Sequence, residues 1–138
     1  AEASLREYGY LQNVLPNPTN RVTEAVARYS VQMADNLDAE AIFSLTDTGF
    51  TSRLVSKHRP ECPILAITRS KLVARRMAMN WGVTPICYDG NGDDEAKLAY
   101  ALEEAKRLGF IGPGDTLVVT SGHHQTTGST DLIRVVTM

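Results

Sequence analysis

Two loops rich in hydroxyl groups are the places where this sequence could do chemistry. The first is Thr46-Asp47-Thr48-Gly49-Phe50-Thr51-Ser52, which opens directly into a segment with helical spacing. Hydroxyls and free backbone N–H groups at a positive helix end are the groups that bind anions, phosphate above all. These residues therefore predict a phosphate site. A structural interpretation stays open, in which Thr48 or Thr51 caps the helix and Gly49 serves the turn.

The second loop covers residues 121–131, SGHHQTTGSTD, and is long enough to fold over a ligand. Both of its histidines could turn inward and bind an anion when protonated. A metal site would need a third ligand at a defined spacing, and the one other histidine, His58, ends a predicted helix. We therefore predict no metal in this chain. The candidate ligands of this loop are Gly122, His123, His124, Thr127 and Gly128.

Motifs for catalysis are scarce. The sequence contains no GxSxG element for a serine nucleophile. Asp47 follows a strand as a phospho-acceptor would, but no lysine follows the strand at 116–121 to complete that kind of site. The glycine fragments at 90–92 and 109–114 do not join a strand to a helix, as a dinucleotide-binding motif must. Trp81 is interpreted as packing at a helix end. We predict no catalytic residue.

The elements that position the two loops follow from the hydrophobic pattern. Strand-like runs at 41–46, 63–68, 84–88 and 116–121 alternate with helical runs at 51–58, 71–81 and 93–109. This alternation predicts parallel strands joined by right-handed crossovers. The connection at 122–131 is too short for a crossover helix, so the last strand, 132–136, should return antiparallel. The predicted fold is α/β, a three-layer open sheet of about five strands whose carboxyl ends carry the ligand loops.

Two helices precede this alternation. Residues 1–15 have helical spacing and are stopped by Pro16-Asn17-Pro18. The next helix should be capped by Thr19 or Asn20 and end near Asn36. We therefore divide the chain into a lead-in helix with its linker, 1–17, and an α/β domain, 18–138. The predicted inward stripe of the second helix is Val22, Ala25, Val26, Tyr29, Met33 and Leu37.

Composition excludes several classes of protein. The chain has 138 residues and a formal charge of −2, with no block of like charge that could follow a nucleic acid backbone. It lacks a membrane-length apolar run and a signal peptide. Cys62 and Cys87 are isolated and read as buried, reduced thiols, which favours the cytoplasm. A start at Ala1 fits either an excised piece of a longer protein or removal of an initiator methionine.

Four ordered motifs resemble the C-terminal domain of pyruvate kinase, from about Pro18 to the end. The first is the Thr-rich loop at 46–51, which matches Thr-x-Ser-Gly-x-Thr with Thr48 in place of Ser. The others are Arg59-Pro60-Glu61-Cys62-Pro63-Ile64, Trp81-Gly82-Val83-Thr84-Pro85 and Gly114-Asp115. Residues 1–15 resemble the helix with which the family's catalytic barrel leads into this domain.

This resemblance implies that catalysis lies elsewhere. In the family, phosphoryl transfer from phosphoenolpyruvate to ADP, with Mg²⁺ and commonly K⁺, occurs in a barrel domain that these 138 residues do not contain. The C-terminal domain binds a phosphorylated sugar or nucleotide effector and forms part of a homotetramer. The implied effector-phosphate residues are Thr46, Thr48, Gly49 and Thr51, with residues 122–130 closing over the sugar. The expected partners are the effector, the barrel domain and further copies of the chain.

Asp47 and Phe50 occupy variable loop positions where some effector-regulated members of the family place Lys or Arg. Asp47 brings a negative charge that repels phosphate, so Arg53, Lys57 or the loop histidines would have to supply positive charge. Two alternatives remain beside an effector-binding domain. One is a structural interface domain without an effector, whose last strand pairs with another copy. The other is a stand-alone α/β protein that binds a phosphometabolite.

Overall fold

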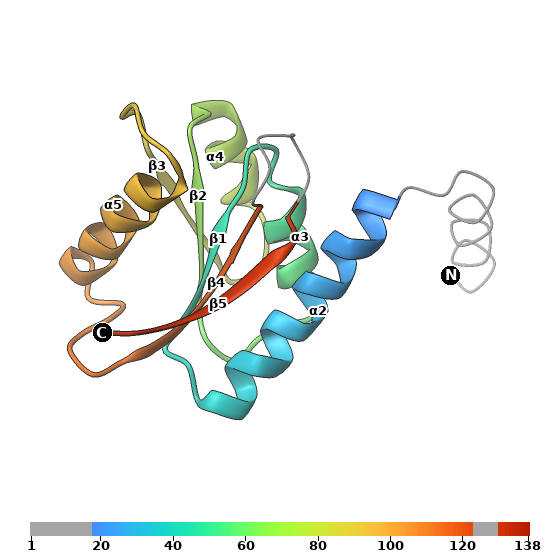
Figure 1. Ribbon diagram of the computed structural model, residues 1–138. Coiled ribbons are helices and arrows are strands. Elements are labelled where there is room, and N and C mark those ends of the chain that lie inside the picture. Colours follow the sequence, from blue (N-terminus) through green and yellow to red (C-terminus); the bar gives the residue numbers. More distant parts are fainter. Residues whose placement is uncertain (1–17, 123–129) are drawn as a thin grey trace.

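The computed structural model describes residues 18–122 and 130–138, and a single five-stranded sheet organises them (Figure 1). Its order is β3 (Val83–Cys87), β2 (Ile64–Thr68), β1 (Ala41–Leu45), β4 (Thr116–Ser121) and β5 (Leu132–Thr137). The first four strands of the chain are parallel, and β5 is antiparallel to β4. The predicted α/β fold with an antiparallel last strand is confirmed.

Helices cover both faces of this sheet, which gives the predicted three layers. On one face, α5 (Asp94–Arg107) packs through Leu98 and Ala101 against apolar residues of β1, β2 and β4. On the other face lie α2 (Pro18–Leu37), α3 (Phe50–Lys57) and α4 (Lys71–Met77), which share a second apolar cluster with the sheet. Figure 1 shows α5 on the opposite side of the sheet from α2 and α3.

The helix ends agree with the sequence in α5 and differ in α4. The Asp93 side chain accepts a hydrogen bond from the Ala96 N–H at 3.0 Å, and Gly109 follows the helix with φ of +85°. Helix α4 ends at Met77, so Trp81 lies in the next turn and does not close a helix. Trp81 is 48% exposed and lies under the Arg59 guanidinium, 4.6 Å from the ring centroid. The prediction that Trp81 closes a helix is therefore wrong, and its half-buried ring packs under Arg59 at the surface.

The inward face of α2 also differs from the predicted stripe. Val22, Tyr29 and Leu37 are about half exposed, although Val26 is buried as expected. The small side chains of α2 allow a closer approach to the sheet than the large ones would. Its buried residues are Thr23, Val26, Ala27, Ser30, Val31 and Ala34. The helix begins at Pro18 instead of after a cap at Thr19 or Asn20, because proline suits a first turn whose N–H groups need no helical partner.

The lead-in helix predicted for residues 1–15, and with it the boundary drawn at residue 17, lies outside the described residues. Within them, none of the helices is both long enough and apolar enough to cross a membrane. Cys62 and Cys87 are free thiols, and both are half-buried instead of fully buried as predicted.

Candidate functional site

The two predicted loops leave the sheet at the one point where its strand order changes direction. From β1 the chain moves outward through β2 to β3, and then returns to place β4 on the other side of β1. Strands β1 and β4 pair in parallel, so their carboxyl ends lie side by side. In open α/β sheets, loops that diverge at such a point leave a crevice that binds ligands. The structure thus brings both loops to the place that topology favours for a ligand site.

The first loop is held by its own hydroxyls. The Gly49 N–H donates to Thr46 Oγ1 at 2.9 Å, and the Phe50 N–H donates to Thr48 Oγ1 at 3.3 Å. Gly49, with φ of +85°, is the residue before the first turn of α3, and no side chain caps that helix. The capping role predicted for Thr48 or Thr51 is therefore wrong. Apart from that of Phe50, which Thr48 accepts, the N–H groups of the first turn of α3 are directed toward the loop, because a helix leaves them without internal acceptors.

Buried hydroxyls join the first loop to the end of the second. Thr51 Oγ1 and Thr130 Oγ1 lie 2.7 Å apart, and the Thr23 hydroxyl donates to the Thr130 carbonyl at 3.4 Å. Ser52 Oγ donates to Ser44 Oγ at 3.0 Å, so the polar cluster continues into β1. These hydroxyls face the α2 and α3 layer, at the carboxyl edge of the sheet.

One hydroxyl of this region has no hydrogen-bond partner in the part of the chain that the structure describes. It belongs to Thr120, which is fully buried in β4 and pairs in register with Ser44 of β1. A buried hydroxyl without a partner is uncommon in folded proteins and commonly marks a place for a water molecule or a ligand atom. This unsatisfied group lies beside the candidate crevice.

A lysine that the sequence interpretation missed supplies positive charge on the α5 side of the loop. Lys97 is only 4% exposed, and its Nζ lies 3.9 Å from Asp47 Oδ1 and 3.9 Å from Asp94 Oδ1. Its position in the helix carried a signal, because Lys97, Ala101 and Ala105 recur at intervals of four and all face the sheet. A single charged residue within an apolar stripe indicates a buried charge with a partner.

Of the two helix cations named from the sequence, Arg53 lies at the loop and Lys57 does not. The Arg53 guanidinium lies over the Phe50 ring, 5.5 Å from its centroid, and the side chain is exposed. Lys57 is in the last turn of α3, about 10 Å along the helix from the loop. Lys57 therefore lies too far along α3 to contact a group bound at the loop.

Only the two ends of the second loop can be placed. Gly122 is half-buried, and the Asp131 N–H donates to the Ser121 carbonyl at 3.1 Å, which closes the base of the loop. His123, His124, Thr127 and Gly128 lie outside the described residues, so their predicted roles stay predictions.

Comparison with known proteins identifies the family. The family model described as "Pyruvate kinase, alpha/beta domain" matches residues 24–136. The chain belongs to the pyruvate kinase family. A pyruvate kinase of Clostridium acetobutylicum is 33% identical over 136 residues, and pyruvate kinase 1 of Saccharomyces cerevisiae is 36% identical over 144 residues. These matches cover 98% and 100% of this chain and 29% of each relative.

The pyruvate kinase match confirms the resemblance and the fold that the four motifs indicated. The chain is the C-terminal α/β domain of the family. It spans less than a third of the length of these curated relatives, so its sequence and structure report on this domain alone.

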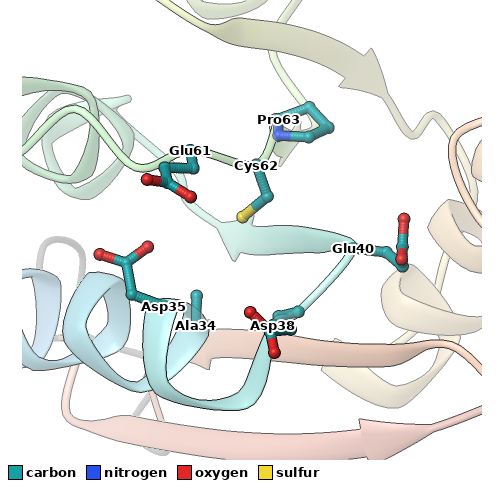
Figure 2. Close-up of a pocket in the computed structure, with 8 residues that line it drawn as sticks. Ala34, Asp35, Asp38, Glu40, Glu61, Cys62 and Pro63 are labelled. Carbon is teal, nitrogen blue, oxygen red and sulfur yellow. The ribbon is translucent and has the colours of Figure 1, made fainter.

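This pyruvate kinase domain has a concave region at the opposite end of its parallel strands, before β1 and β2. A cavity of about 300 Å³ lies between the end of α2 and the turn before β2 (Figure 2). Four carboxylates and the Cys62 thiol line it. Its acidic residues are Asp35, Asp38, Glu40 and Glu61. Among the described residues, no three His, Cys, Asp or Glu side chains are grouped so as to hold a metal ion.

Burial and negative charge make the Cys62 thiol unreactive. Burial is the larger cause, and the neighbouring Asp35, Glu40 and Glu61 add to it, so that the pKa of Cys62 rises to about 11. At neutral pH this thiol stays protonated, whereas nucleophilic and metal-binding cysteines require the thiolate. Cys62 is therefore not an activated nucleophile in the acidic cavity of the pyruvate kinase domain. The carboxylates of this cavity would repel a phosphate, so the loops that follow β1 and β4 are the better candidate for a phosphate site.

Proposed function

We propose that this chain is the regulatory and oligomerisation domain of a pyruvate kinase, and that it binds a phosphorylated sugar or nucleotide effector where β1 and β4 end. The longer enzyme would transfer phosphoryl from phosphoenolpyruvate to ADP, using Mg²⁺ and K⁺, in a barrel domain that contacts this one. The family membership of the chain supports that proposal. No step of the phosphoryl transfer is assigned to residues of this domain.

The observation that carries the effector proposal is the contact of buried Lys97 with Asp47 of the hydroxyl loop. A phosphate at the start of α3 would accept hydrogen bonds from the first-turn N–H groups and from the exposed Thr48 hydroxyl. The Lys97 ammonium is 3.9 Å from Asp47 of that loop and would supply positive charge that Lys57, at the far end of α3, is too distant to give. Arg53, beside Phe50, is the other cation at the loop. The helix dipole of α3 acts in the same direction.

Two surfaces support self-association of the chain. Helix α2 carries three large hydrophobic side chains that are each about half exposed to solvent. They are Val22, Tyr29 and Leu37. Strand β5 is an edge of the described sheet, and its Leu132 and Val135 are each 45% exposed. Exposed large apolar side chains and an open sheet edge are both features found at protein–protein contacts. These surfaces alone would also suit a structural interface domain without an effector.

The effector proposal is tested by an amide NMR titration of the 138-residue chain. Fructose 1,6-bisphosphate, ribose 5-phosphate and AMP are added separately, with unphosphorylated ribose as the control ligand. We expect saturable shifts in residues 46–52 and 122–130, and their loss in Lys97→Met. No shift with any phosphate at millimolar concentration would leave the interface function as the better description.

The oligomer proposal is tested by sedimentation velocity of the same chain across a range of concentrations. Tyr29→Lys places a charge in the middle of the exposed α2 face and should weaken association. Arg21→Lys is the matched control, because Arg21 is exposed on the same helix and the substitution keeps its charge. A wild-type chain that stays monomeric at every concentration would contradict self-association by this domain alone.

A further inference from the structure

The buried lysine of the candidate site already forms ion pairs with two carboxylates of the same chain. Lys97 Nζ lies 3.9 Å from one oxygen of Asp47 and 3.9 Å from one oxygen of Asp94. The lysine side chain is 5% exposed, whereas the side chains of Asp47 and Asp94 are 54% and 48% exposed. The ammonium is thus covered, and both of its counter-ions face water.

A buried ammonium is costly without a counter-ion, so this arrangement stabilises the loop in the absence of any ligand. The two distances are longer than a hydrogen bond, and each is a charge contact only. The trio of one cation and two anions carries a net charge of −1. A phosphate that reaches Lys97 while both carboxylates stay in place therefore meets net repulsion.

The two carboxylates differ in how readily they can leave. Asp94 is in the first turn of α5, three residues before Lys97, where the positive end of the helix dipole favours a negative charge. Asp47 is on the loop between β1 and α3, and it is the more exposed of the two. Displacing Asp47 therefore requires only that a solvated loop side chain rotate away.

We propose that Asp47 is an internal ligand of Lys97, and that a phosphate binds this domain only by displacing the Asp47 carboxylate. This inference rests on the proposed phosphate site and specifies its ligand. An anion with a single charge that displaces Asp47 leaves the attraction to Lys97 almost unchanged, because one negative charge replaces another. A phosphomonoester carries up to two negative charges near pH 7, so its attraction to Lys97 is stronger than that of the carboxylate it displaces. Asp47 thus selects phosphomonoesters over phosphodiesters and carboxylates, and it lowers the affinity for all of them.

The test compares Asp47→Asn with three further variants in the titration of the whole chain with ribose 5-phosphate at fixed ionic strength. Glu95→Gln is the charge control, because Glu95 is also in the first turn of α5 but pairs with Arg134 at 2.8 Å. Lys97→Met removes the cation. Asp47→Ser is a second variant at the key position, in case Asp47→Asn perturbs the loop. The amide spectrum of each variant reports whether it is folded.

We expect Asp47→Asn and Asp47→Ser to bind ribose 5-phosphate about fivefold more tightly than the wild type, which is the scale of one partly exposed ion pair. Glu95→Gln should change the affinity less than twofold. The two Asp47 variants should also begin to bind cyclic AMP, a phosphodiester probe.

Three other results would overturn the inference. If Lys97→Met abolishes binding but both Asp47 variants bind like the wild type, the phosphate site stands and the internal ligand does not. If Glu95→Gln tightens binding as much as the Asp47 variants, the effect is overall charge. If neither the wild type nor any variant binds a phosphate, the proposed site fails together with the inference.

Discussion

The hydroxyl oxygens of Thr51 and Thr130 lie 2.7 Å apart, although the two residues are separated by 79 positions in the sequence. Thr51 is in the first turn of α3, and Thr130 ends the second ligand loop just before β5. Both side chains are buried. This one hydrogen bond therefore joins the two loops of the candidate site, and any motion that separates the loops must break it.

We predict a measurable coupling between these two threonines. Thr51→Val or Thr130→Val alone leaves a buried hydroxyl without its partner, and each should lower the free energy of unfolding by about 1–3 kcal/mol. The double variant should cost less than the sum of the two, because no unpaired hydroxyl remains. Urea unfolding of all four chains measures the coupling. Thr137→Val, at an exposed position of β5, is the control, and strict additivity would contradict the prediction.

Strand and helix types were predictable from the sequence wherever the local pattern and the end signals agreed. In α5, the acidic start and basic end agree with the apolar stripe, and the structure has the helix as predicted. The antiparallel direction of β5 followed from the length of its connection alone. The position of both loops at one edge followed from parallel topology. These features depend on residues within each element or in the connections beside it, and those residues can be read directly from the sequence.

Features that depend on contacts between distant elements were not predictable. The buried face of α2 consists of small residues such as Ala27, Ser30 and Ala34, because close approach to the sheet outweighs side-chain hydrophobicity there. Lys97 was not predictable as a ligand candidate, because it is within a helix and its partner Asp47 is on a loop 50 residues earlier in the chain. The sequence alone also gave no reason to pair Thr51 with Thr130.

A second prediction separates backbone strain from crowding at the start of α3. Gly49 and Gly109 both have φ of +85°, where any other residue is strained. A Cβ at Gly49 would lie 3.0 Å from Met77 Cγ, whereas a Cβ at Gly109 meets nothing within 4 Å. Gly109→Ala should therefore cost about 1 kcal/mol of unfolding free energy from strain alone. Gly49→Ala should cost more in the same thermal or urea experiment, and equal losses would contradict the role given to Met77.

A third prediction concerns the turn that leads into α5. The Arg69 guanidinium donates hydrogen bonds to the carbonyls of Gly90 and Gly92 and lies 5.4 Å from the Tyr88 ring centroid. Lysine cannot reproduce this forked geometry. Arg69→Lys should speed amide hydrogen exchange about tenfold at Ala96 and Lys97, whose N–H groups donate to Asp93 at the start of α5. This is the equivalent of losing one to two hydrogen bonds.

The control for this experiment is Arg75→Lys, at an exposed position of α4. It should leave exchange in α5 unchanged. A uniform increase along the whole of α5 in Arg69→Lys would indicate general destabilisation, and it would remove the specific role of Arg69 in holding the helix start.

A fourth prediction concerns the Cys62 thiol of the acidic cavity. Its pKa of about 11, against an ordinary 9.0, reduces the reactive thiolate by about a hundredfold at pH 8. Peptide mass spectrometry should show iodoacetamide labelling of Cys62 that is slower by about this factor than that of N-acetylcysteine. Asp35→Asn combined with Glu61→Gln should accelerate labelling by less than tenfold, since burial is the larger cause. Labelling at the rate of the free thiol would contradict the raised pKa.

The last prediction is a pH dependence of stability that originates at His58, the residue that ends α3. Burial lowers the pKa of His58 below its ordinary 6.5, and the positive charges of Lys57 and Arg28 lower it further. As the pH falls through 6.5, the unfolded chain takes up a proton at His58 before the folded chain does. Protonation therefore favours unfolding, and His58 lowers stability progressively from about pH 6.5 down to its folded pKa. His58→Gln removes this effect, while the other two histidines remain in both chains. Urea unfolding at pH 7.5, 6.5 and 5.5 should show a smaller loss of stability on acidification in His58→Gln than in the wild type, and an equal or larger loss would show that His58 titrates alike in both states.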